Sequence, residues 1–80
     1  MKNIKIKYGE LYIREYVISK NKDIIIFLKP KYEDDLSSIK YYCINRNEYG
    51  AFLMQRYAKE CIEFGKIRLL SEEKEIVGNS

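Results

Sequence analysis

The feature that most constrains this chain is a run of five consecutive apolar residues, Ile24 to Leu28, in the stretch IIIFL. β-Branched and aromatic residues favour strands, and a short run without polar interruption is typical of a strand inside a sheet. A polar stretch at 19–23 precedes the run, and Pro30, which cannot donate to a sheet ladder, follows it. We therefore expect a central strand that is buried on both faces.

Alternating apolar and polar residues predict further strands on either side of this run. Residues 3–8 alternate isoleucine with lysine, and Gly9-Glu10 resembles a tight hairpin turn that leads into a second strand at 11–19. Residues 39–44 predict a strand after the central one, and 66–70 predict a short fifth strand. The expected sheet is a mainly antiparallel meander of four to five strands.

A different period indicates one amphipathic helix over about 46–64. Its apolar stripe recurs every three or four residues and consists of Gly50, Leu53, Met54, Tyr57, Ala58, Cys61 and Ile62. Asn45 or Asn47 is placed to cap its start, and Gly65 suits a left-handed residue after its end. The fold class is therefore α+β, with the helix packed on one face of the sheet.

Length and composition predict one compact domain at 1–70 and a tail at 71–80 that is frayed or a loosely attached strand. No apolar run approaches the roughly 20 residues of a membrane span, and the lysine–isoleucine alternation at the N-terminus is unlike a signal peptide. Cys43 and Cys61 form no CxxC pair, and we interpret them as reduced thiols of a cytoplasmic protein.

The residue types needed for catalysis or metal binding are scarce. The sequence has no histidine, its four glycines are isolated, and neither cysteine has a basic neighbour placed to activate it. The acidic cluster Glu33-Asp34-Asp35 lacks the ligand spacing of a calcium loop. We expect no enzyme, no metal and no cofactor.

The stretch at 9–21 holds the candidate binding residues. Tyr12, Arg14 and Tyr16 alternate, so they share one face of a strand. If the opposite residues Leu11, Ile13 and Val17 face the helix, these three face outward. Tyrosine and arginine are enriched at protein-binding hot spots, but tyrosine also favours strands for packing reasons alone. Both interpretations stay open from the sequence.

These observations predict a small non-enzymatic binding protein that contacts a host protein or protein complex. The predicted partner-binding residues are Tyr12, Arg14, Tyr16, Tyr32, Glu33, Asp34 and Asp35. Small size and residue usage typical of A+T-rich genomes favour a phage or mobile-element inhibitor of the anti-defence or anti-CRISPR type.

Two alternatives remain. The first is a nucleic-acid-binding module in which the tyrosines stack on bases and lysines hold phosphates, namely Lys5, Lys7, Lys20 and Lys22. The second is a homodimer that buries the open sheet face. The sequence pI of about 8.8 is below that of most basic nucleic-acid-binding domains.

Overall fold

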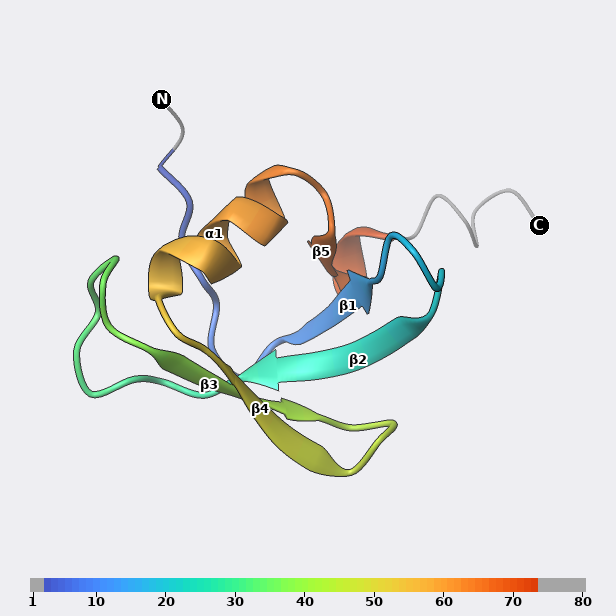
Figure 1. Cartoon of the computed structure of the whole chain (residues 1–80), viewed down its shortest axis with the longest axis horizontal. Helices are drawn as coiled ribbons and strands as arrows, with labels where there is room; N and C mark the ends of the chain where they lie inside the picture. Colours follow the sequence, from blue (N-terminus) through green and yellow to red (C-terminus); the bar gives the residue numbers. More distant parts are fainter. Residues whose placement is uncertain (1–2, 74–80) are drawn as a thin grey trace.

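In the computed structural model, which describes residues 3–73, five strands form one antiparallel sheet and an α-helix packs against it (Figure 1). The elements are β1 (Leu11–Glu15), β2 (Lys22–Phe27), β3 (Ile39–Cys43), β4 (Glu48–Phe52), α1 (Gln55–Glu63), β5 (Ile67–Leu69) and the 3-10 turn η1 (Leu70–Glu72). The strand order is β4-β3-β2-β1-β5, so β1 to β4 form a meander and β5 joins its β1 edge. The predicted α+β class is confirmed.

The apolar run at 24–28 does form the central strand, with two strands on each side of β2. Its residues alternate in burial: Ile25 and Phe27 are buried, whereas Ile24 and Ile26 are only half-buried. The expectation of burial on both faces is therefore wrong. Only one face of the sheet is covered within the described residues.

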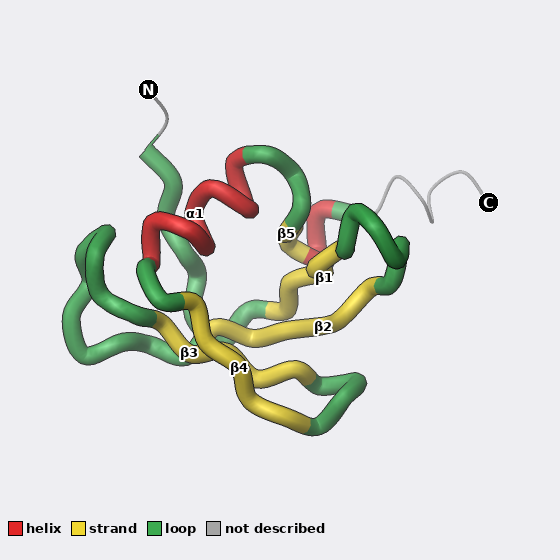
Figure 2. Tube along the Cα trace, in the orientation of Figure 1, coloured by secondary structure: helices red, strands yellow, loops and turns green. Residues whose placement is uncertain are grey.

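The core lies between the sheet and a cover made of α1 and the N-terminal segment 3–8. Its buried apolar residues are Ile6, Tyr12, Ile25, Phe27, Ile39, Cys43, Ala58 and Ile67. Segment 3–8 is not a strand, contrary to the predicted hairpin (Figure 2). It buries Ile6, and the backbone N–H of Lys7 donates to the Tyr12 hydroxyl at 3.1 Å. Its apolar residues therefore serve as part of the cover.

The predicted helix 46–64 starts too early, because α1 begins at Gln55 and residues 48–52 form β4. β4 pairs with β3 along its whole length, and Asn47, with φ of 55°, supplies the left-handed residue of the connecting turn. Neither Asn45 nor Asn47 caps the helix. The predicted end is confirmed, since Gly65 follows α1 with φ of 80°.

Backbone carbonyls of the loop between β2 and β3 cap the start of α1. The N–H of Gln55 donates to the Ser37 carbonyl at 2.7 Å, and the N–H of Arg56 donates to the Asp35 carbonyl at 3.0 Å. The buried Gln55 amide also donates to the Tyr32 carbonyl. Helix N–H groups that have no partner within the helix are thus satisfied by the loop.

Two further predictions from the sequence are the absence of a membrane span and a C-terminal tail at 71–80. Within residues 3–73, no helix has the length and apolar character needed to cross a membrane. Of the predicted tail at 71–80, residues 71 and 72 belong to η1, and 74–80 lie outside the described residues.

Gly50 provides a test of β4 packing, because a Cβ at this position would lie 2.5 Å from the Tyr41 ring. That ring is held between Phe27 and Phe52, so it cannot move away without disturbing the core. We expect Gly50→Ala to lower the free energy of unfolding by about 1–3 kcal/mol in urea titrations.

The matched control is Ala51→Val, on the exposed side of the same strand, with an expected change within about 0.5 kcal/mol. In a Tyr41→Val background, Gly50→Ala should lower the free energy of unfolding by a smaller amount. An equal cost in both backgrounds would show that the Tyr41 contact is not its cause.

Candidate functional site

The sheet surface turned away from α1 is one of two candidate sites, and we call it the outer face. By strand register it carries Leu11, Ile13, Ile24, Ile26, Lys40, Tyr42, Tyr49 and Ala51. None of these residues is buried, whereas the buried strand residues all lie on the face toward α1. No element within residues 3–73 covers this surface.

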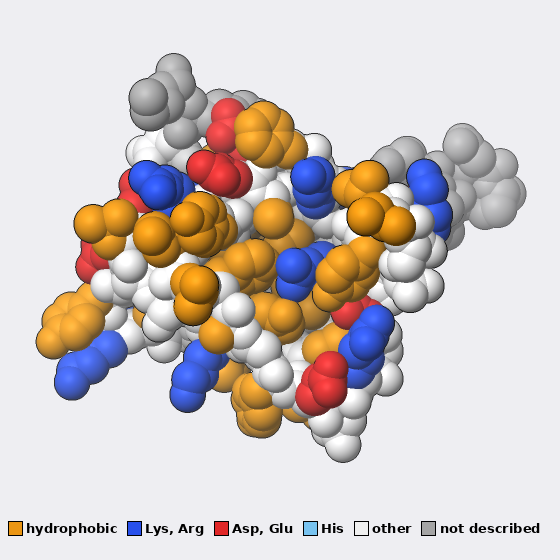
Figure 3. Space-filling model, viewed as in Figure 1, with side chains coloured by type: hydrophobic (Ala, Val, Ile, Leu, Met, Phe, Trp, Pro, Cys, Tyr) orange, Lys and Arg blue, Asp and Glu red, His pale blue; other side chains and the backbone are white. Residues whose placement is uncertain are grey.

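Apolar residues on the outer face form a row across four strands. Leu11 pairs with Ile26, Ile26 with Tyr42, and Tyr42 with Tyr49. The rings of Tyr42 and Tyr49 lie 4.9 Å apart, and Tyr49 is 71% exposed. In the orientation of Figure 3, hydrophobic side chains reach the molecular surface in several separate places, with basic side chains between them. The structure therefore leaves a continuous apolar row open to contact.

The structure decides between the two possible orientations of β1. Leu11 and Ile13 lie on the outer face and not toward the helix, Leu11 is 40% exposed, and Val17, which follows β1, is 61% exposed. Tyr12 instead packs edge-on against Phe27 at 5.2 Å and is only 2% exposed. Both sets of alternate residues in 11–17 are largely apolar, and the larger aromatic side chain fills the core. Tyr12 is thus not available to a partner.

Arg14 and Tyr16, the other two residues of the predicted row, form the second candidate site together with Tyr41 and Phe52. The guanidinium carbon of Arg14 lies 4.8 Å from the Tyr16 ring centre, 5.7 Å from Tyr41 and 4.9 Å from Phe52. Its Nη1 donates to the Tyr41 hydroxyl at 3.1 Å. Three rings thus hold one half-buried arginine in a fixed position.

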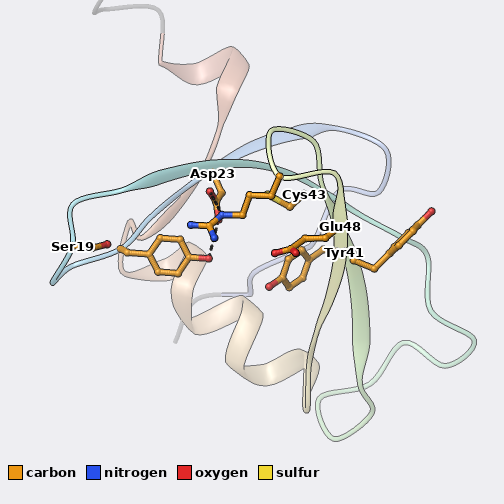
Figure 4. A pocket seen from close by; sticks show the side chains of 8 residues that line it. Ser19, Asp23, Tyr41, Cys43 and Glu48 are labelled. Atoms are coloured by element: carbon orange, nitrogen blue, oxygen red, sulfur yellow. Dashed lines mark hydrogen bonds and ion pairs between the residues drawn. The ribbon is translucent and has the colours of Figure 1, made fainter.

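Beside these rings lies a hollow of about 240 Å³, lined in part by Tyr16, Asp23, Tyr41, Arg46 and Glu48 (Figure 4). In the close-up, Glu48 and Tyr41 lie next to each other. Asp23 lies on the other side of the hollow, where dashed lines mark its hydrogen bonds. Arg14 is next to this space through Tyr16 and Tyr41 and is not one of the residues that line it, so we call the space the Asp23 hollow.

Asp23 is the buried polar centre of that cluster and is 3% exposed. Its carboxylate accepts hydrogen bonds from the Tyr16 hydroxyl at 3.0 Å, from the Asn45 amide at 3.1 Å and from Nε of Arg46 at 3.0 Å. Burial opposes ionisation, but these donors outweigh it, so the pKa of Asp23 is lowered from its ordinary value. Burial also raises the pKa of Tyr16.

The predicted acidic loop at 32–35 does not join these sites, because it lies at the opposite end of the sheet from the turn after Tyr16 (Figure 1). Tyr32 is 63% exposed. Oε2 of Glu33 lies 4.0 Å from Nζ of Lys29. Asp34 accepts bonds from the following turn, and Asp35 pairs with Lys59 at 2.9 Å. Asp34 and Asp35 stabilise the loop and its attachment to α1.

The lysines of the nucleic-acid alternative are also separated. Lys5 and Lys7 lie in the N-terminal segment, whereas Lys20 and Lys22 lie in and after the turn between β1 and β2 (Figure 1). All four are exposed, but they occupy two distant parts of the molecule. The structure does not bring them into one basic surface.

Sequence reasoning missed several residues that surround Arg14 or line the Asp23 hollow beside it. Alternation from Ile39 placed Tyr41 on one face of a strand, but nothing local paired it with Arg14. Phe52 was assigned to a helix, and Asp23 and Arg46 were assigned to turns or helix ends. Within residues 3–73, no group of three or more histidine, cysteine, aspartate or glutamate side chains is placed to hold a metal ion.

Comparison of the sequence and fold with protein-family models, curated proteins and solved structures finds no match. We therefore argue function from the geometry of the outer face and of the second candidate site around Arg14.

The lowered pKa of Asp23 predicts a pH dependence of stability. Because the folded-state pKa lies below the unfolded value of about 3.9, the ionised carboxylate stabilises the fold above that pH, and this contribution is lost as pH falls through the folded pKa. We expect Asp23→Asn to lower the free energy of unfolding by about 1–3 kcal/mol at neutral pH. The difference from wild type should shrink toward pH about 2.5 in urea titrations.

Glu60→Gln is the control, because Glu60 is an exposed carboxylate on α1 with no ion pair among residues 3–73. Its effect should be small at both pH values. A loss for Asp23→Asn that is equal at neutral and acid pH would assign the effect to shape and not to charge.

Proposed function

We propose that this protein is a non-enzymatic binding protein that acts through protein–protein contacts, with the outer face as its contact surface. The observation that carries the proposal is the uncovered row formed by Leu11, Ile26, Tyr42 and Tyr49. A sheet with one cover must leave its other face to solvent or to a partner. Contiguous exposed apolar surface of this kind is characteristic of interaction sites.

Charge at the border of the outer face indicates the partner's chemistry. Lys40 on β3 and Lys22 on β2 are exposed and make no ion pair within residues 3–73. The nearby Arg68 is already paired with Glu15 and Glu73. A complementary surface is apolar at its centre and acidic at its rim. A second copy fits less well, because the two basic borders would repel each other.

We further propose that the protein is a phage or mobile-element product that inhibits a host protein, of the anti-defence or anti-CRISPR type. What supports it is the small size of the protein and its usage of isoleucine, lysine, tyrosine and asparagine, as in A+T-rich genomes. Two free cysteines suit the reducing cytoplasm as its place of action.

Replacing two outer-face residues tests the contact surface. We expect the double variant Leu11→Ser, Tyr49→Ser to weaken capture of a bacterial protein by about 10-fold or more, since central apolar and aromatic anchors dominate interface energy. The measurement is affinity capture from nuclease-treated lysate of a low-GC bacterium, followed by mass spectrometry. Phe64→Ser is the matched control, because Phe64 is 70% exposed at the end of α1, away from the outer face.

Three outcomes would overturn this proposal. Equal capture by the double variant would exclude the outer face as the contact. Material that is lost on nuclease treatment would identify nucleic acid as the ligand. Light scattering that gives twice the monomer mass for wild type, but the monomer mass for the double variant, would show that a second copy occupies the surface.

A further inference from the structure

Arg14 has a cross-strand neighbour that it does not pair with. Asp23 lies directly opposite it in the ladder between β1 and β2, the usual position for an ion pair. Asp23 instead accepts three hydrogen bonds from Tyr16, Asn45 and Arg46. Among residues 3–73, Arg14 makes no ion pair at all. The opposite carboxylate is thus bonded to other donors, and Arg14 has no ion-pair partner among the described residues.

The donors of Arg14 are open to a ligand. Of its guanidinium nitrogens, only Nη1 has a partner among the described residues, the Tyr41 hydroxyl. No buried side-chain nitrogen or oxygen within residues 3–73 lacks a hydrogen-bond partner. The unbonded Nε and Nη2 are therefore accessible to solvent. An arginine offers five N–H donors in a rigid fork, so most of its binding capacity is unused.

The position of this fork is fixed before any ligand arrives. The rings of Tyr16, Tyr41 and Phe52 contact the guanidinium, and the Tyr41 hydroxyl sets its orientation. Tyr16 is itself held by its bond to Asp23. Such an arrangement reduces the entropy that a flexible arginine loses on binding.

From this geometry we propose that Arg14 is a binding site for a carboxylate group carried by a polypeptide. The planar fork matches a carboxylate through two parallel hydrogen bonds. The site lies on the face of the sheet opposite the outer face, so the inference goes beyond the proposed function and does not depend on it.

Two features of the surroundings favour a carboxylate over other ligands. A cationic ligand is disfavoured, because Arg14 already occupies the faces of the three rings. Glu48 disfavours a phosphate dianion more strongly than a singly charged carboxylate, because it is an exposed carboxylate that lines the neighbouring Asp23 hollow beside Tyr41 and makes no ion pair within residues 3–73.

The test is an NMR titration of the arginine Nε–Hε signals in ¹⁵N-labelled protein with N-acetylglutamate amide. We expect a saturable shift of the Arg14 signal. Arg46 and Arg68 are internal controls, because their Nε atoms already donate to Asp23 and Glu73. Arg56, exposed on α1, reports non-specific ion effects. The Arg14→Lys variant assigns the signal, and Tyr41→Phe should weaken binding by about 3-fold, because it removes only the orienting hydroxyl.

Further probes define the ligand class. N-Acetylglutamine amide should leave the Arg14 signal unchanged, and tighter binding of N-acetylglycine would identify the terminal carboxylate of a polypeptide as the group that is bound. The proposal is overturned if Arg14 and Arg56 shift alike, if the neutral amide acts equally, or if inorganic phosphate binds more tightly. The Leu11→Ser variant should give the wild-type titration, because Leu11 lies on the outer face and does not line the hollow, so failure here is distinguishable from failure of the outer-face proposal.

Discussion

One row of aromatic rings holds the sheet together and also builds the site beside it. Tyr12, Phe27, Tyr41 and Phe52 come from four successive strands, and Phe27 contacts the other three at 5.2, 6.3 and 6.2 Å. Such pairs contribute about 0.5–1.5 kcal/mol each beyond the area they bury. Because Tyr41 also lies over a glycine on one side and binds Arg14 on the other, core packing and the geometry of the arginine are set by the same ring.

The sequence was sufficient for the fold class and for the central strand, because IIIFL between polar turns has few alternatives in so short a protein. It was insufficient for residues 48–52, whose apolar positions fit both a helical and a strand period. Pairing with β3 decided the outcome, together with the absence of a Cβ at Gly50 beneath Tyr41. That contact depends on the register of the β3–β4 hairpin, which the pattern of apolar residues does not specify.

The same limit applies to the sites. Because the sequence predicted a single helix, it correctly indicated that one face of the sheet is open. Both alternating sets of residues in 11–17 contain apolar side chains, so the sequence could not indicate which face this is. Arg14 and Tyr16 could be identified by type and spacing. Their surroundings could not, since Asp23 and Phe52 reach them only through the register of β2 and β4. With only nine residues, α1 leaves part of its own face of the sheet without a helical cover.

The way the β2–β3 loop caps α1 has a consequence for how this protein can change through evolution. The acceptors at Asp35 and Ser37 are backbone carbonyls, which every amino acid possesses. Side chains of this loop other than Asp34 and Asp35 can therefore vary without uncapping the helix, whereas an insertion or deletion would move the carbonyls out of reach. Natural variation here should appear as changes of residue at constant loop length.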